Sequence, residues 1–373
     1  MATIVLDKLT KVFGKQTAVK ELTLEIPDKS FVAFLGPSGC GKTTTMNMIS
    51  GLLKPDGGAV SFDGKIMNDV PAGKRGVGFM FQNYAVFTHM TVFENISFGL
   101  MIRKMPEKKI REEVNKYAEL MQIDHLLDMP AVKLSVNDMQ KTALARSMVT
   151  NPQIFLLDEP LSNLDASLRN VMRAELKKIQ QELGQTSVYV THDQIEAMSL
   201  ADKIAVMNFA VLQQYDTPHN VYNKPANLFV AKFIGSPTMN FFAGEYENGS
   251  IKLREYQGAS ITVFSRHKQL IDKDLKHDRV VLGIRPEHLK LSDTPVEGCT
   301  QLKAKIISYE PLGSKTVVYL HPEGGSDLIV KSSMSSDYKS KLGDIKYLEY
   351  NEKDFYLFDE VTTDLVLRFS AEQ

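Results

Sequence analysis

The sequence predicts an α/β domain followed by a smaller all-β domain, and three observations support this. The chain has 373 residues, too many for one ordinary domain. Up to about residue 235, short apolar runs alternate with segments of helical periodicity, which is typical of a parallel sheet covered by helices. After residue 236 the periodicity fades, and short β-rich runs favour a small barrel or sandwich. We therefore expect domains at residues 1–235 and 236–373, joined at Gly235-Ser236-Pro237.

The expected elements follow from these runs. A helix is expected over residues 169–183, because Met172, Leu176, Ile179 and Leu183 share one face. In the first domain, we expect strands at Phe31–Leu35, Ile154–Leu157, Ser187–Val190 and Ile204–Met207. In the second domain, we expect strands at Val280–Ile284, Ala304–Ile307, Thr316–Leu320, Leu328–Val330 and Phe355–Phe358.

Composition excludes several classes of protein. The net charge of −1 gives no field for holding nucleic acid, so no nucleic-acid partner is expected. The two cysteines, Cys40 and Cys299, do not predict a disulfide framework and fit a reducing compartment. No signal peptide opens the sequence, and no apolar run reaches the ~18 residues that span a bilayer. We expect a cytoplasmic protein that reaches a membrane through its partners.

A phosphate-binding loop is the strongest motif. It follows an apolar strand and opens a helix, which is the context that the pattern G-x-x-x-x-G-K-[ST] requires. Its glycines let backbone N–H groups cradle phosphate oxygens, and the helix adds its positive dipole end. We expect Lys42 to reach the β- and γ-phosphates of ATP, and Thr43 to bind Mg²⁺. The expected nucleotide-binding residues are Gly36, Pro37, Ser38, Gly39, Cys40, Gly41, Lys42, Thr43 and Thr44.

Two acids and a histidine follow later strands. Asp158 ends the apolar run Ile154–Leu157, and Asp158 is expected to hold Mg²⁺ as the Walker B aspartate does in P-loop NTPases. Glu159 is placed to orient or deprotonate the attacking water. His192 follows the strand Ser187–Thr191; a lone histidine is more often packed or on the surface, so its catalytic role depends on the family pattern.

Further motifs extend the pattern along the chain. They are Phe81-Gln82-Asn83-Tyr84, Pro160-Leu161-Ser162-Asn163-Leu164-Asp165 and Thr191-His192-Asp193. With the P-loop and the two acids, they resemble the ATPase subunits of ABC transporters, above all the importers of sugars and polyols. The resemblance implies a P-loop ATPase domain with a helical subdomain. It also implies that Gln82 senses Mg²⁺ and the γ-phosphate, that His192 bonds the γ-phosphate, and that Phe13 stacks on adenine.

The C-terminal part shares the resemblance. The bridge from Asn227 to Pro237 and the run Gly283-Ile284-Arg285-Pro286-Glu287-His288-Leu289 resemble the family's oligonucleotide-binding-like regulatory domain. Such a domain does not imply nucleic-acid binding. The resemblance further implies two transmembrane permease subunits and, indirectly, an extracellular solute-binding protein. It places the chain at the cytoplasmic face of the inner membrane as a peripheral protein.

One motif departs from the family. Where the family has Leu-Ser-Gly-Gly-Gln, this chain has Leu134-Ser135-Val136-Asn137-Asp138. In ABC dimers this loop faces the partner's nucleotide, and Ser135 is the residue expected to bind it. At ~5 Å and an effective dielectric of about 20, the charge of Asp138 costs about 3 kcal/mol per unit charge of the phosphate. We expect a heterodimer with a second ATPase of intact signature; a homodimer, with the loop divergent but functional, is the alternative.

Three functions compete. The first is an import motor for a sugar, a polyol such as glycerol, or glycerol phosphate. The second is a soluble ABC-type ATPase acting on ribosomes or DNA, but tandem ATPase domains or a coiled-coil insertion are absent from the sequence. The third is a weakly catalytic subunit that completes a partner's assembly.

Overall fold

The computed structural model describes residues 2–162, 164–254, 256, 260–262, 265–295, 302–324 and 328–369. Asn163, Cys299 and the side chain of Leu183 lie outside this described part. The chain forms two compact units that divide between Pro218 and His219. Among the described residues, no helix has the length and apolar character needed to cross a membrane.

The main sheet of the first unit has six strands in the order β10-β9-β3-β8-β7-β6. Five run parallel, and β10 is an antiparallel edge strand. All five residues of β3 are buried, as expected for a parallel strand covered on both faces. The four strands expected here are confirmed. The bounds are β3 Phe31–Leu35, β6 Val77–Met80, β7 Ile154–Asp158, β8 Thr186–Thr191, β9 Lys203–Asn208 and β10 Val211–Asp216.

A second, antiparallel sheet of the first unit was not expected from the sequence. Its order is β2-β1-β4-β5. Buried and exposed residues alternate along the second half of β2, and exposed residues interrupt the other strands, so this sheet lacks the continuous apolar runs of the main sheet. Their buried residues share one core with the main sheet. The bounds are β1 Ile4–Phe13, β2 Gln16–Ile26, β4 Gly57–Phe62 and β5 Lys65–Ile66.

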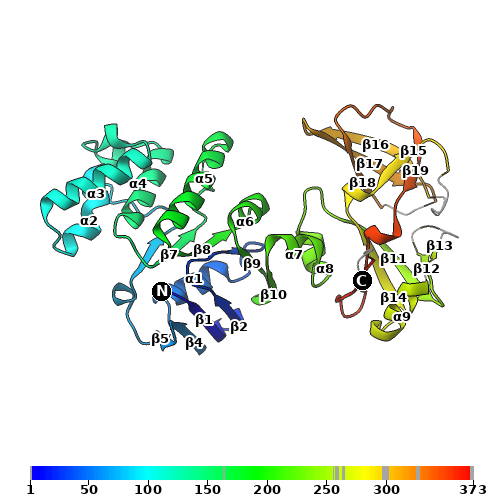
Figure 1. Ribbon diagram of the computed structural model, residues 1–373, viewed down its shortest axis with the longest axis horizontal. Coiled ribbons are helices and arrows are strands. Elements are labelled where there is room, and N and C mark those ends of the chain that lie inside the picture. The colour runs from blue at the N-terminus through cyan, green and yellow to red at the C-terminus, as the bar shows by residue number, and fades with distance from the viewer. Residues whose placement is uncertain are drawn as a thin grey trace. The chain divides into compact units, whose positions relative to one another are not determined.

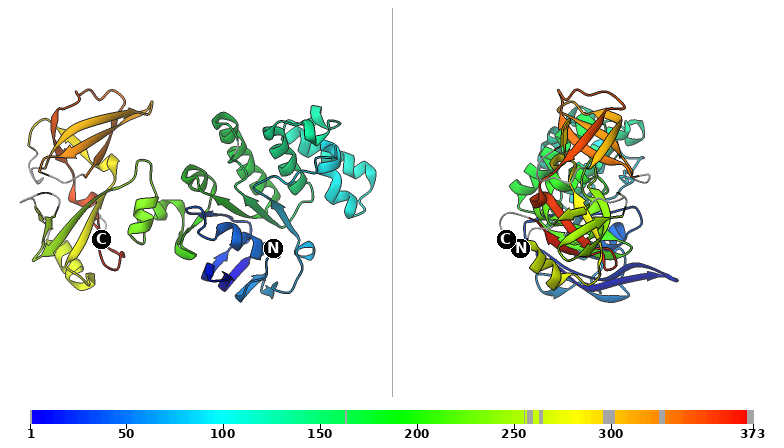
Figure 2. Two further views of the ribbon diagram at one scale, coloured as in Figure 1. Left: turned by 180° about the vertical axis from the view of Figure 1, so that it is seen from behind. Right: turned by 90° about the vertical axis from the view of Figure 1, so that its right-hand side faces the viewer.

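Three helices of the first unit form a group of their own. In Figure 1, and again from behind in Figure 2, α2, α3 and α4 form a helical group beside the sheets, where they pack on one another. This is the expected helical subdomain. In α5 the expected face is confirmed for Met172, Leu176 and Ile179, which are buried. The bounds are α1 Lys42–Ser50, α2 Val92–Ile102, α3 Glu107–Leu120, α4 Val136–Met148, α5 Ala166–Leu183 and α6 Gln194–Leu200, with short 3₁₀ turns η1 Ala72–Lys74, η2 Asp124–Leu126 and η3 Ala131–Lys133.

In the described residues of the second unit, two antiparallel sheets share a hydrophobic core, as the sequence predicts for an all-β domain (Figure 2). Their orders are β13-β12-β11-β14-β20-β21 and β15-β19-β16-β17-β18. One expected strand differs. The sequence predicts a strand at Leu328–Val330, but β18 begins at Val330 and continues to Ser335 through mostly polar residues, of which Ser332 is buried. The bounds are β11 Asn240–Glu247, β12 Ser250–Leu253, β13 Ser260–Thr262, β14 Arg279–Ile284, β15 Lys290–Ser292, β16 Lys303–Pro311, β17 Lys315–Pro322, β18 Val330–Ser335, β19 Ile345–Glu349, β20 Phe355–Asp359 and β21 Leu365–Arg368.

Two short helices before the expected joint also belong to the second unit. The Arg285 guanidinium is fully buried, and it donates to the backbone oxygens of Tyr222 (2.7 Å) and Ile234. The Tyr222 hydroxyl donates to Glu287 at 2.5 Å. These bonds fasten the helices to the β domain, so the compact units divide at residue 218, whereas the sequence places the joint at 235. The remaining bounds are α7 Pro218–Asn223, α8 Leu228–Phe233, α9 Ser265–Asp274, η4 Pro286–His288 and η5 Glu352–Asp354.

Candidate nucleotide site

The P-loop connects the end of β3 to the start of α1. Lys42 is buried, and its ammonium donates to the backbone oxygens of Gly36 and Pro37, both at 2.8 Å. Only glycine fits at two positions. A Cβ at Gly36 would lie 2.2 Å from the Met207 oxygen, and one at Gly41, whose φ is +103°, would lie 2.3 Å from the Ala18 oxygen.

The N-terminus of α1 opens into a pocket. Gly41 precedes the helix, no side chain caps it, and its first turn carries no acid. Its N–H groups and positive dipole end are therefore left to a ligand, which suits an anion. The pocket is lined by Gln16, Ala18, Ser38, Gly39, Gly41, Lys42, Thr43, Thr44, Gln82 and Glu159.

A pair of oxygen ligands lies at the strand end beside the loop. The Thr43 hydroxyl donates to Asp158 Oδ1 at 3.1 Å. Burial raises the pKa of Asp158 to about 6, although the Thr43 hydrogen bond opposes this. The described residues contain no group of three or more acidic, histidine or cysteine side chains that could hold a metal. Mg²⁺ needs none, because it is usually held by one or two carboxylates together with substrate phosphates and water, so Thr43 and Asp158 fit it.

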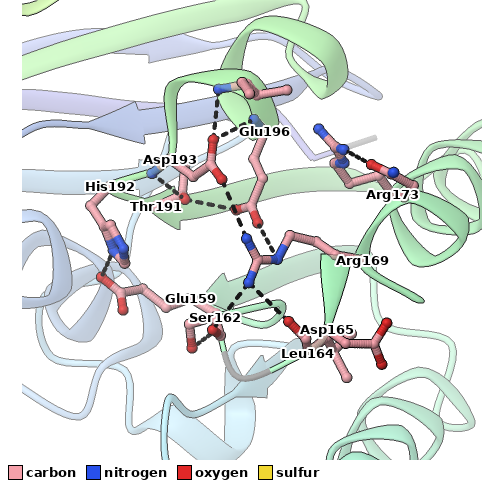
Figure 3. A network of polar contacts seen from close by, with 12 residues as sticks. Glu159, Ser162, Leu164, Asp165, Arg169, Arg173, Thr191, His192, Asp193 and Glu196 are labelled. Carbon is pink, nitrogen blue, oxygen red and sulfur yellow. Dashed lines mark hydrogen bonds and ion pairs between the residues drawn. The ribbon is translucent and has the colours of Figure 1, made fainter. Parts of the chain in front are cut away.

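The three side chains predicted to be catalytic meet at Glu159. Gln82 Nε2 donates to Glu159 Oε2 at 2.8 Å. His192 Nδ1 lies 3.0 Å from Glu159 Oε1 (Figure 3). Because an ionised carboxylate only accepts, Nδ1 is the donor in this bond. Glu159 has a φ of +47°, which is uncommon for a residue other than glycine.

Phe13 stands at the edge of this region. It ends β1, is 52% exposed, and pairs across the hairpin with Gln16, which lines the pocket. The Lys11 ammonium lies 5.5 Å from the centre of its ring, and Phe13 itself does not line the pocket. The exposed part of the ring offers a surface on which a flat ligand could stack.

Ser135 does not line this pocket; it caps the start of α4 instead. Ser135 Oγ accepts from the Asp138 backbone N–H at 3.2 Å and donates to Asp138 Oδ2 at 2.7 Å. The serine hydroxyl and the first acid of the helix therefore satisfy one another. Val136, where the family has glycine, is 52% exposed.

Sequence reasoning missed two parts of this region. Gln16 and Ala18 line the pocket from β2, and the hairpin around Gly14 was the available signal. Arg169 and the buried Glu196 form a polar cluster behind His192, and no local motif marked them.

Comparison with known proteins agrees with this geometry. Residues 19–162 match the ABC transporter family. Residues 235–289 match the MalK OB fold domain, and residues 282–358 match the TOBE domain.

Relatives match along the whole chain. The trehalose/maltose import ATP-binding protein MalK of Thermococcus litoralis is 43% identical, covering 97% of this chain and 99% of that protein. The sn-glycerol-3-phosphate import ATP-binding protein UgpC of Psychromonas ingrahamii is 40% identical, covering 97% and 95%. The chain therefore belongs to the ATP-binding subunits of ABC importers of the carbohydrate-uptake type, which are transporter ATPases, and it has an altered signature loop.

Solved structures resemble the first unit. The dimeric structure of MJ0796, a bacterial ABC transporter cassette, has a TM-score of 0.55 and 29% identity, covering 58% of this chain and 98% of that one. A post-hydrolysis state of the same cassette, bound to ADP and Pi, has a TM-score of 0.54 and 28% identity over the same share of each chain.

Proposed function

We propose that this chain binds Mg²⁺-ATP in the P-loop pocket and hydrolyses it to drive the uptake of a sugar, a polyol such as glycerol, or glycerol phosphate. The relatives named for trehalose/maltose and for sn-glycerol-3-phosphate import support this range of solutes. The observation that carries the proposal is the hydrogen-bonded set of Gln82, Glu159 and His192, which lies beside Lys42 and Thr43.

Each residue has a role that its position supports. The Lys42 ammonium and the N–H groups of the P-loop bind the β- and γ-phosphates, because they supply positive charge at the helix start. Thr43, Asp158 and Gln82 supply oxygen ligands for Mg²⁺, which when bound neutralises phosphate charge. Phe13 contributes affinity by stacking on the base.

Glu159 and His192 act together in hydrolysis. Glu159 orients a water and accepts its proton, and its bond from Gln82 holds the carboxylate toward the pocket. His192 uses Nδ1 to donate to Glu159, which leaves Nε2 for the γ-phosphate. Because phosphate oxygens only accept, Nε2 bonds them as a donor, with the ring carrying hydrogen on both nitrogens. A carboxylate fixed by two partners loses little freedom when the substrate arrives.

The test is uptake in cells whose only copy of this chain carries Glu159→Gln. We expect transport to stop while the chain still co-purifies with its membrane subunits. Unchanged transport would show that this site is not the motor and would favour the role of a weakly catalytic subunit. Co-sedimentation with ribosomes instead of membranes would favour a soluble ATPase.

We also propose that the chain pairs with a second ATPase subunit of intact signature. The Ser135 hydroxyl is committed to Asp138, whose carboxylate occupies the start of α4, where a partner's phosphate would bind. The same carboxylate repels a polyanion. In a heterodimer, the site built on Lys42 and Glu159 would face an intact signature, whereas a homodimer would have two weakened sites.

Two transmembrane permease subunits are the expected membrane partners, with a solute-binding protein acting through them. The chain would then lie on the cytoplasmic face of the membrane as a peripheral protein.

The segment after Gln82 suits a role in coupling hydrolysis to transport. Arg146 of α4 donates to the backbone oxygens of Tyr84 (2.9 Å) and Ala85 (2.8 Å), and these bonds connect the segment to the helical group. Phe87→Asp should uncouple ATP hydrolysis from uptake without weakening nucleotide binding; weaker binding would indicate a structural role.

A further inference from the structure

Behind Glu159 and His192 lies a second polar cluster, centred on Arg169 of α5 (Figure 3). Arg169 Nη2 donates to the Leu164 backbone oxygen at 2.9 Å and lies 3.5 Å from that of Ser162. Nη1 lies 3.8 Å from Asp193 Oδ2, and Nε lies 4.0 Å from Glu196 Oε1. The planar guanidinium therefore spans two segments, the loop after Glu159 and the start of α6 after His192.

The loop side of this bridge leads directly to Glu159. Both the backbone N–H and the hydroxyl of Ser162 donate to the Glu159 backbone oxygen, at 3.3 and 3.0 Å. Glu159 adopts an uncommon positive φ, which persists only where its surroundings hold it. Arg169 holds the loop that supplies these bonds.

The α6 side leads in the same way to His192. The buried Glu196 accepts from the Tyr189 hydroxyl at 2.8 Å and from the Thr191 hydroxyl at 2.7 Å. Asp193 caps α6 by accepting from the Ile195 N–H at 2.7 Å. Thr191 and Asp193 flank His192, so its backbone is fixed on both sides.

The positive charge of Arg169 also stabilises two neighbouring carboxylates. Asp193 and Glu196 both lie within 4.0 Å of the guanidinium, and the Glu196 side chain is only 4% exposed. A buried carboxylate needs hydrogen bonds and a nearby cation to remain in place. Removing the cation would free both acids to move, and the start of α6 would move with them.

We propose that Arg169 is a positioning residue that keeps Glu159 and His192 within hydrogen-bond distance by bridging the two segments that carry them. Arg169 acts through the loop and α6, and it contacts neither Glu159 nor His192 in the set of bonds described above. The inference rests on the proposed function, because it assigns Glu159 and His192 to hydrolysis.

The test compares three variants of the full-length chain. Arg169→Met removes the bridge, and Arg169→Lys keeps the charge but cannot reach both segments at once. Arg173→Met is the matched control, because Arg173 lies one turn along α5 and bonds Asn170. In complex with the subunits that support turnover, kcat should fall at least about tenfold for both Arg169 variants while KM for ATP changes less than about threefold. The control should stay within about twofold of the wild type.

A spectroscopic readout separates positioning from general destabilisation. The ¹⁵N resonances of His192 in ¹⁵N-histidine-labelled chain, identified by their loss in His192→Gln, report which ring nitrogen carries hydrogen. In the wild type we expect a fixed Nδ1–H. In Arg169→Met we expect the two nitrogens to average, with folding confirmed by circular dichroism.

The outcomes are distinct. An unchanged His192 spectrum, a smaller fall in kcat, or full recovery by lysine would overturn the bridge. If Arg169→Met does not fold, Arg169→Lys decides by the same criteria. If Glu159→Gln leaves turnover intact, the proposed function fails, but the His192 spectrum still decides whether Arg169 positions the pair.

Discussion

Two helices of the first unit begin at loops that the sequence predicts to contact phosphate, and they begin differently. The helix α1 follows Gly41, has no side-chain cap, and carries no acid in its first turn. The helix α4 follows Ser135, which caps it, and Asp138 in its first turn bonds the same serine.

The difference is electrostatic. The free N–H groups at a helix start carry about half a positive charge. In α1 this charge faces the pocket, whereas in α4 Asp138 supplies an anion from within the chain. The comparison supports our proposal that one chain carries a strong P-loop half of an ATP site and a weak signature half.

The largest effect on ATP hydrolysis should come from replacing Glu159, the acid of the P-loop half. Glu159→Gln keeps the shape of the side chain but cannot accept a proton, so kcat should fall by about 10²- to 10⁴-fold. The rate of phosphate release from ATP measures kcat. ATP affinity should be retained, and the exposed Glu182→Gln on α5 is the control. Normal turnover in Glu159→Gln would place catalysis elsewhere.

The next effect should come from rebuilding the signature half. Replacing Val136 and Asn137 by glycine and Asp138 by glutamine removes the self-made cap and its charge. At about 3 kcal/mol for one charge pair, the ATPase rate of the chain alone should rise at least about tenfold. The control Asp128→Asn removes another exposed charge, ten residues before Asp138, and should change nothing. If the rebuilt loop gives no gain, the altered signature is not the limiting feature.

A smaller effect concerns the base. Phe13→Ala should weaken ATP binding about fivefold, because one stacking contact contributes about 1 kcal/mol. GTP binding should weaken equally, since stacking does not distinguish the bases. Titration of both nucleotides measures this, with the exposed Phe209→Ala as control. Selective loss of ATP would indicate that Phe13 recognises adenine specifically.

The smallest effect concerns pH. The pKa of Asp158 is raised to about 6 by burial, so its carboxyl takes up a proton as the pH falls through that value. The neutral form binds Mg²⁺ weakly. The ionised fraction, and with it Mg²⁺-dependent ATP affinity, should therefore fall about fourfold from pH 7.5 to 5.5. Asp158→Asn removes the part of this pH dependence that comes from Asp158 and leaves the part that comes from protonation of the nucleotide. An equal fall in affinity in the variant would exclude Asp158 as the cause.

The sequence predicted the parts that local chemistry determines. Every residue of β3, β7 and β8 is buried because both faces of the sheet are covered, and most of these residues are apolar. The P-loop needs glycine at Gly36 and Gly41 for steric reasons. The antiparallel sheet was missed because strands of the first domain were predicted only from continuous apolar runs. In β2, polar and apolar residues alternate from Glu21 to Ile26, a pattern that predicts a half-buried strand.

Other features depend on tertiary contacts and were out of reach. Arg169 bonds backbone oxygens and approaches acids on another helix, and no spacing in the sequence announces that bridge. The Ser135–Asp138 bond is different, because a serine followed three residues later by an acid is a recognisable helix start. The helix cap was not predicted, because this stretch was interpreted only as an altered form of the family's signature.

The most direct measurement is the ATPase rate of the purified chain, alone and mixed with a second ATPase subunit that carries an intact Leu-Ser-Gly-Gly-Gln. We expect little turnover from the chain alone and a strong gain in the mixture that disappears when this chain carries Glu159→Gln. Rapid, Glu159-dependent turnover by the chain alone would contradict the account.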